Sequence, residues 1–365
     1  MTGVQEAFSH SYSEARQKFI RAAGAAGLPV ESRLHPRKGL QGEDLAMDVV
    51  REGDAGADKL LIVSSACHGV EGFCGSGVQV AALGDTALRT RAAERGVALL
   101  HIHGLNPFGF SYFRRTTHEN VDLNRNFHDF SRPLPVNAGY RELHPVMVPR
   151  DWPPGEDNAR AIAAYIARHG EKAYQAAVSG GQHEFADGLF YGGRAPTWSN
   201  QAVREVLRAH GRRAARVAWI DLHTGLGPNG VGERIYAGRN DLVALARTRR
   251  WWDGGGRTPI TSFYDGSSTS AVLTGLMFGS VFDECPQAEY TGIALEYGTV
   301  PILETLQALR GEQWLNAHPD APADQAAAIR QRMMDAFYTD TDDWRERIVT
   351  QAREAILQGI DGLAG

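Results

Sequence analysis

Short apolar runs, separated by longer amphipathic segments, recur along the chain. A continuous apolar run bounded by glycine and polar residues is typical of a buried strand in a parallel sheet. Residues 6–27 place apolar side chains at helical spacing with charge on the other face, which predicts an amphipathic helix. Residues 30–54 alternate around a glycine turn and predict a hairpin or two edge strands. The four apolar runs are 59–66, the segment from Gly96 to Asn106, Val217–Ile220 and Thr291–Leu295.

Two long segments have a different pattern. Residues 131–200 begin rich in proline, glycine and charge and become helical at 158–177, which predicts an excursion over the surface near the mouth of a cleft. Residues 302–365 have a largely helical pattern, with no strand-rich second domain. A chain of 365 residues with 43% hydrophobic residues can bury the core of two domains or of one large α/β unit.

Charge and cysteine content exclude several classes of protein. The net charge is −5 without a basic block, so a nucleic-acid partner is not indicated. No apolar run approaches the length needed to cross a bilayer, so we expect a soluble cytoplasmic protein without a membrane partner. The three cysteines are too few and too scattered for a disulfide framework or a thiolate zinc site. The oligomeric state is left open.

The first apolar run ends on His68 and Glu71, an imidazole and a carboxylate three positions apart. The glycines at 69, 72 and 75 allow a tight turn, so both side chains can converge above the strand end. They are two of the three protein ligands that a catalytic zinc needs. The pair alone is not specific, because 13 histidines and 43 acidic residues produce this spacing by chance. The alternative is a helix N-terminus with an acidic first turn.

The segment 112–127 carries Arg114, Arg115 and Arg125 beside Asn124. Guanidinium groups bind carboxylates bidentately and stabilise developing oxyanions, and a side-chain amide can bind the same anion. The alternative is an exposed polar loop. Apolar residues alternate with the polar ones in VDLNRNF, which favours a segment held against the core.

The last two apolar runs also end on residues that can carry chemistry. His223 follows the third run, 152 residues beyond Glu71, a long gap typical of a third zinc ligand from another strand. Asp221, two residues earlier, can accept the other ring N–H of that histidine and fix its tautomer. Glu296 closes the fourth run, and a carboxylate in that place is costly to bury unless it is used or paired.

In this order, the motifs resemble those of the zinc carboxypeptidases of the M14 type, and more closely their bacterial branch known as DUF2817. The matching motifs are NPxGF, RR followed by NVDLNRNF, HTGLG and EYGT, and the likeness runs from about residue 55 to 300. The resemblance implies one catalytic domain over residues 1–365. It also implies the phosphorylase/hydrolase-like α/β fold, a mixed, mostly parallel central sheet flanked by helices.

The resemblance also implies roles for individual residues. One Zn²⁺ per chain would be held by His68, Glu71 and His223, with Glu296 as general base. Arg115 matches the arginine that stabilises the oxyanion, with Arg114 as the alternative. The remaining candidates bind substrate: Asn124 and Arg125 match the pair that grips its carboxylate, and Tyr264 is the candidate for a tyrosine near the active site.

These parts predict zinc-dependent hydrolysis of amide bonds, with a zinc-bound water and a glutamate base, on a peptide or small peptide-like substrate with a free carboxylate. The alternative is an N-acyl amino acid amidohydrolase of the succinylglutamate desuccinylase and aspartoacylase type, whose residue order is similar. The helical pattern after residue 302 argues against their β-rich C-terminal domain, whereas the 131–200 excursion, which would narrow a cleft, argues for small substrates. A third hypothesis is a metal-free binding protein on a hydrolase scaffold. The preferred substrate side chain is not encoded in a readable motif.

Overall fold

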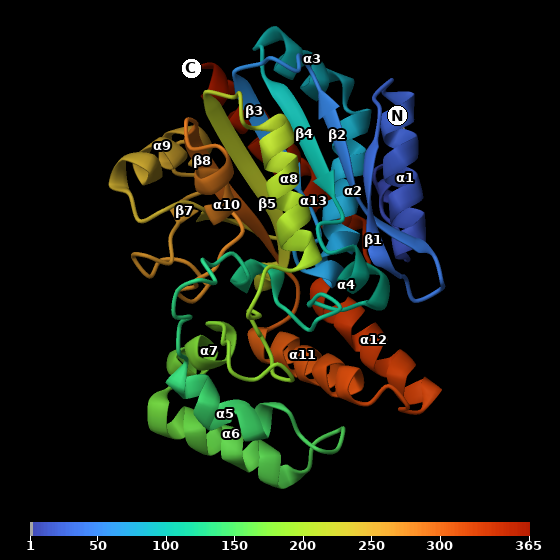
Figure 1. Ribbon diagram of the computed structural model, residues 1–365, viewed down its shortest axis with the longest axis vertical. Coiled ribbons are helices and arrows are strands. Elements are labelled where there is room, and N and C mark those ends of the chain that lie inside the picture. The colour runs from blue at the N-terminus through green and yellow to red at the C-terminus, as the bar shows by residue number, and fades with distance from the viewer. Residues whose placement is uncertain (1–2) are drawn as a thin grey trace.

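The computed structural model describes residues 3–365 and contains one eight-stranded sheet flanked by helices (Figure 1). Four neighbouring strand pairs are parallel and three are antiparallel, which confirms the predicted mixed, mostly parallel sheet. In spatial order the strands are β1 (Glu31–Lys38), β2 (Asp44–Glu52), β4 (Ala98–His103), β3 (Lys59–Ser64), β5 (Arg216–Asn229), β8 (Glu289–Gly298), β6 (Gly232–Tyr236) and β7 (Ile260–Thr261).

The central strands are apolar on both faces because helices cover the sheet from both sides. On β3, Leu61 and Val63 pack into one core cluster, while Leu60 and Ile62 pack into another on the opposite face. The alternation of side chains along a strand therefore explains the continuous apolar run. The first cluster contains residues of α2 (Gly72–Gly84), α3 (Thr86–Glu94), α9 (Leu242–Trp252) and α13 (Asp342–Ala364), and the second contains residues of α8 (Trp198–His210) and α10 (Gly279–Glu284).

The N-terminal segments form the predicted elements with one change. The hairpin expected at 30–54 is the antiparallel pair β1–β2. The helix expected at 6–27 is a short 3₁₀ turn, η1 (Val4–Ala7), followed by α1 (Tyr12–Ala25). The interruption arises because the Ser11 side chain accepts the N–H of Glu14 and starts a new helix.

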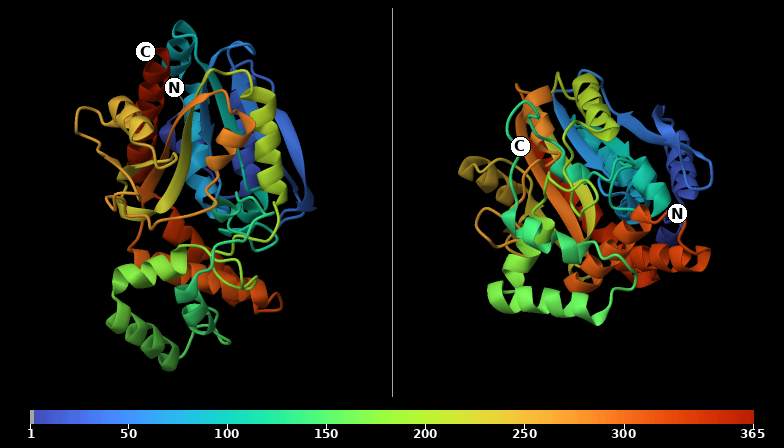
Figure 2. Two further views of the ribbon diagram at one scale, coloured as in Figure 1. Left: turned by 60° about the vertical axis from the view of Figure 1, so that its left-hand side comes forward. Right: turned by 60° about the horizontal axis from the view of Figure 1, so that its bottom comes forward.

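The 131–200 segment forms a helical group below the sheet, beside the C-terminal helices (Figures 1 and 2). The single helix expected at 158–177 is divided, because Gly170 adopts φ 87° and ends its first half. Arg310 donates hydrogen bonds to the carbonyls of Val146 and Met147, so the group is tied to the helix that carries this arginine. The helices concerned are α5 (Ala138–Met147), α6 (Glu156–His169), α7 (Glu171–Ser179), α11 (Ile302–Ala317) and α12 (Ala323–Phe337).

Over residues 3–365, the helices are each too short or too polar to cross a lipid bilayer.

Candidate metal centre

The turn after β3 is fixed by close backbone packing. His68 immediately precedes the 3₁₀ turn η2 (Gly69–Glu71). A Cβ at Gly69 would lie 2.0 Å from the carbonyl carbon of Gly109 in α4 (Pro107–Tyr112), so only glycine fits there. This contact holds His68 and Glu71 in one orientation at the end of the strand.

The same turn is bonded to the arginine segment. The N–H groups of Gly69 and Val70 donate to the carbonyls of Arg115 and Arg114, at 3.2 and 2.8 Å. Backbone hydrogen bonds therefore join the two motifs, which lie far apart in the sequence.

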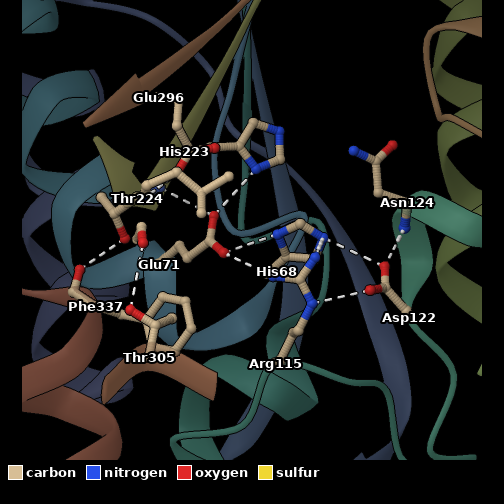
Figure 3. Close-up of polar contacts among 12 residues, drawn as sticks. His68, Glu71, Arg115, Asp122, Asn124, His223, Thr224, Glu296, Thr305 and Phe337 are labelled. Atoms are coloured by element: carbon tan, nitrogen blue, oxygen red, sulfur yellow. Dashed lines mark hydrogen bonds and ion pairs between the residues drawn. The ribbon is translucent and has the colours of Figure 1, made fainter. Parts of the chain in front are cut away.

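The structure brings His68, Glu71 and His223 together (Figure 3). Nδ1 of His68 lies 2.8 Å from Oε1 of Glu71, and Nδ1 of His223 lies 3.0 Å from Oε2. The parallel register that pairs Ser64 with Asp221 places the ends of β3 and β5 side by side, which explains how His223 reaches the pair. The three side chains are buried, and one ligand atom from each falls within 4.8 Å of the others.

Each imidazole also has a carboxylate on its outer nitrogen. Oδ2 of Asp221 lies 2.7 Å from Nε2 of His223, and Oδ1 of Asp122 lies 3.3 Å from Nε2 of His68. These contacts leave both Nδ1 atoms directed at Glu71. Sequence reasoning considered Asp221 for this position but missed Asp122, whose only signal was an acid placed between apolar Val121 and Leu123.

The charges of the centre are strongly coupled. Burial raises the pKa of a carboxyl, yet His68 and His223 hold the pKa of Glu71 below its usual value. Burial disfavours the imidazolium, but Asp221 and Glu71 together raise the pKa of His223 well above its usual range. Burial and the charge of Glu71 raise the pKa of Glu296 to about 8. Glu71 is therefore held as a carboxylate between the two imidazoles, a form in which it can bind a cation.

A second group of ligand types, Cys67 with Asp221 and His223, lies beside the first. Burial and the charge of Asp221 raise the pKa of the Cys67 thiol, whereas the metal ligand is the thiolate. The two imidazoles and Glu71, with carboxylates on the outer nitrogens, are the donor set that catalytic zinc takes. The residues present fit the metal at the first group.

A cavity of about 120 Å³ opens beside this centre and is lined by Glu296, Asn124 and Arg125 among others. Glu296 pairs with His223 in the β5–β8 register, and one of its oxygens accepts the N–H of Leu226 at 3.1 Å. Oδ1 of Asn124 accepts the N–H of Met277 at 2.9 Å, which holds that amide at the cavity wall. The Nη atoms of Arg125 donate to backbone carbonyls, while its buried Nε has no partner among residues 3–365.

Arg115 contacts the centre and also lines the cavity. Its Nε donates to Asp122 at 2.8 Å and its Nη1 to Glu71 at 3.3 Å, while its Nη2 lies 2.7 Å from Nε2 of His68. Its guanidinium stands 4.9 Å from the ring centre of Phe190, a lining residue that adopts φ 50°. Phe190 was not singled out from the sequence, because no sequence pattern marks a bulky residue for a left-handed turn.

Two other candidates do not line the cavity. Nε of Arg114 lies 2.5 Å from Oε1 of Glu312 and its Nη1 donates to Asn316 on α11. The hydroxyl of Tyr264 donates to the carbonyl of Gly238 at 3.0 Å, and neither residue belongs to the cavity wall. Arg114 thus ties a loop to α11, and Tyr264 is bonded to the backbone after β6, so the roles expected of these two residues stay predictions.

The architecture is that of the carboxypeptidase-like α/β proteins. The structure of bovine thrombin-activatable fibrinolysis inhibitor in complex with tick carboxypeptidase inhibitor matches with TM-score 0.52 and 11% identity over 98% of each chain. A crystal structure of thrombin activatable fibrinolysis inhibitor matches with TM-score 0.54 and 12% identity, covering 99% of this chain and 75% of that one. A metallo-carboxypeptidase from Burkholderia cenocepacia has TM-score 0.44 and 11% identity, covering 90% and 68%. No curated protein matches the sequence.

A family model identifies the protein family of the chain. The family described as a protein of unknown function, DUF2817, matches residues 8–351, and the chain belongs to this family. The resemblance to this family inferred from the four motifs is thereby confirmed.

Proposed function

We propose that this protein is a zinc-dependent hydrolase of amide bonds that acts as a metallocarboxypeptidase on a peptide or small peptide-like substrate with a free carboxylate. The observation that supports this most is the convergence of His68, Glu71 and His223 beside one cavity that Glu296 and Arg115 also line. A binding protein without chemistry would have no use for a buried, coupled set of this composition.

His68, Glu71 and His223 would hold the metal through two Nδ1 atoms and the carboxylate. Zinc, when bound by such a set, acts as a Lewis acid on a carbonyl and lowers the pKa of water to about 7. Asp221 keeps His223 in the tautomer whose Nδ1 is free to bind.

Glu296 is the general base of the proposed reaction. In its carboxylate form it takes a proton from the attacking water and passes it to the leaving nitrogen, and with a pKa of about 8 the fraction in that form increases as the pH rises through neutrality. The N–H of Leu226 holds one oxygen of this carboxyl, which belongs to the cavity wall.

Two arginines complete the proposed site. Arg115 stabilises the negative charge that develops on the carbonyl oxygen, and its contact with Asp122 keeps the guanidinium in place. Asn124 and Arg125, which also line the cavity, bind the substrate carboxylate, and Nε of Arg125 is a donor not used by the described part of the chain.

One observation favours the second candidate function, hydrolysis of N-acyl amino acids. Gln175 and Ser179 at the end of α7 form part of the cavity wall, so the 131–200 segment encloses the site on one side. An enclosed site suits a small substrate better than a long peptide. Within residues 302–365, however, the structure is helical, without the β-rich domain of that group.

Zinc-loaded protein should be assayed in parallel on N-blocked dipeptides with a free C-terminus and on acetyl and succinyl amino acids. We expect about one zinc per chain, lost in His68→Ala, and turnover of the dipeptides. Turnover of the acyl amino acids alone would transfer the assignment to the second function. Protein that binds no zinc and turns over neither set would contradict both.

A further inference from the structure

Two imidazoles outside the metal centre lie against each other, one on the loop that follows Arg125 and one on the loop that follows α7. They belong to His128 and His183, whose ring centres are 5.0 Å apart with the ring planes inclined by 80°. The ring centres of His68 and His223, the proposed zinc ligands, are also 5.0 Å apart. Two imidazoles held at about 2 Å by one tetrahedral ion have ring centres roughly 5 Å apart. The spacing of the second pair therefore suits a shared ion.

The backbone fixes the tautomer of His183. Nδ1 of this ring lies 2.7 Å from the carbonyl oxygen of Gly193, so in the neutral ring Nδ1 carries the proton and Nε2 keeps its lone pair. Metal-binding histidines almost always donate their other ring N–H in this way. The side chain is buried, and a Cβ at Gly192 would lie 2.9 Å from Nε2, so glycine leaves this edge of the ring uncovered.

His128 presents an unpaired nitrogen beside the same backbone. Its Nε2 is buried and has no hydrogen-bond partner among residues 3–365. A Cβ at Gly275 would lie 2.5 Å from this nitrogen and 2.5 Å from the carbonyl oxygen of Arg125. A Cβ at Gly192 would lie 2.6 Å from the same oxygen. The carbonyl of Arg125 is therefore close to the edges of both rings and adds a third possible ligand.

The protonation state of the pair also suits a cation. Burial lowers the pKa of both imidazoles, and the neighbouring His183 lowers the pKa of His128 further. Both rings are therefore neutral at pH 7, which is the form that binds a metal. Zinc, copper and nickel accept imidazole ligands, whereas magnesium and calcium prefer oxygen. Because two imidazoles and a carbonyl carry no charge, this set should bind zinc more weakly than the centre that contains Glu71.

We propose that His128, His183 and the carbonyl oxygen of Arg125 form a second metal site, which binds Zn²⁺ with water in the remaining positions. The site shares no ligand with the proposed catalytic centre and does not depend on the proposed function. A bound ion joins the segment that carries Arg125 to the segment that carries Phe190, whose ring centre lies 5.7 Å from the Arg125 guanidinium. The ion is therefore structural, because it holds two parts of the cavity wall together.

The test counts zinc ions per chain. Chelator-treated protein is titrated with Zn²⁺ by calorimetry, and bound zinc is measured after equilibrium dialysis at increasing free Zn²⁺. The wild type should bind one ion tightly and a second more weakly, and dialysis against zinc-free buffer should remove only the second. His128→Gln and His183→Gln should each keep the first ion and lose the second. His10→Gln removes an exposed histidine, so it is the matched control and should bind two ions.

Thermal unfolding measures the second site without the first. In His68→Ala, zinc at about a hundred times the Kd of the second site should raise Tm by about 3–4 °C. Adding His183→Gln to this variant should abolish the shift, and Mg²⁺ in place of zinc should cause none.

The outcomes separate this site from the proposed catalytic centre. A wild type that binds a single ion at saturation, or a second ion that persists in His128→Gln and His183→Gln, would overturn the second site. Either variant decides the question if the other does not fold. A single ion that is kept in His68→Ala and lost in His128→Gln would retain the second site and overturn the catalytic centre.

Discussion

Replacing Asp221 by Asn tests the metal centre without removing a proposed ligand. Oδ2 of Asp221 lies 2.7 Å from Nε2 of His223, and its charge raises the pKa of that imidazole. Asn has the same shape but no charge, so the fold is kept while Nδ1 of His223 becomes a weaker ligand for the metal. Loss of such an outer carboxylate typically lowers metal affinity 10- to 100-fold.

The expected change in thermal stability follows from this loss. Zinc at a thousand times its Kd stabilises the folded chain by about 4.1 kcal/mol. At the same zinc concentration, the Asn variant should retain about 1.4–2.7 kcal/mol, because each tenfold in affinity is about 1.4 kcal/mol. An unfolding entropy of about 2.1 cal/mol/K per residue makes 1 kcal/mol worth roughly 1.3 °C in a chain of this length. Zinc should therefore raise Tm by about 5 °C in the wild type and about 2–4 °C in the variant.

Differential scanning fluorimetry of chelator-treated protein against zinc measures this shift, and competition with a zinc-binding dye gives the affinity directly. Asp241→Asn is the matched control, because Asp241 caps the exposed start of α9 and Asn caps a helix equally well. Equal zinc affinities in the wild type and in Asp221→Asn would refute the reasoning, since His223 would then not depend on its outer carboxylate.

Three further predictions concern the catalytic residues and the core. Glu296→Gln should bind zinc as the wild type does while kcat falls about 10²–10⁴-fold, measured by metal analysis and steady-state kinetics; full activity would remove the glutamate from its role. Arg115→Ala should lower kcat about 10²–10³-fold, whereas Arg114→Ala should leave Glu312 buried without its partner and cost about 3–5 kcal/mol in urea unfolding. A catalytic loss in Arg114→Ala larger than in Arg115→Ala would reverse these assignments. Burial lowers the pKa of His103 to about 4. As the pH falls below 6.5, this histidine is protonated in the unfolded chain before it is protonated in the folded chain, so its contribution should lower stability by about 3 kcal/mol between pH 6.5 and 4. That slope should be smaller in His103→Gln, and an unchanged slope would contradict the assignment.

The sheet was predictable because its central strands are buried on both faces. An apolar run as short as Leu60–Val63, bounded by polar residues and glycine, is typical of a strand buried on both faces. Such a strand requires helices on both faces of the sheet. The position of Gly170 illustrates the limit, because a glycine within a helical pattern gives no sign of whether the helix continues or ends. With its φ of 87°, Gly170 ends α6, and α7 then packs against α6.

The proximity of the proposed ligands follows from one rule: adjacent parallel strands end at the same edge. That rule places His223 near Glu71 although 152 residues separate them. It does not distinguish Arg114 from Arg115, because neighbouring side chains diverge and the choice depends on Phe113, which adopts φ 58° immediately before them. Motif order therefore predicts which strand ends meet, whereas the direction of a side chain within a loop depends on turns that no periodicity records.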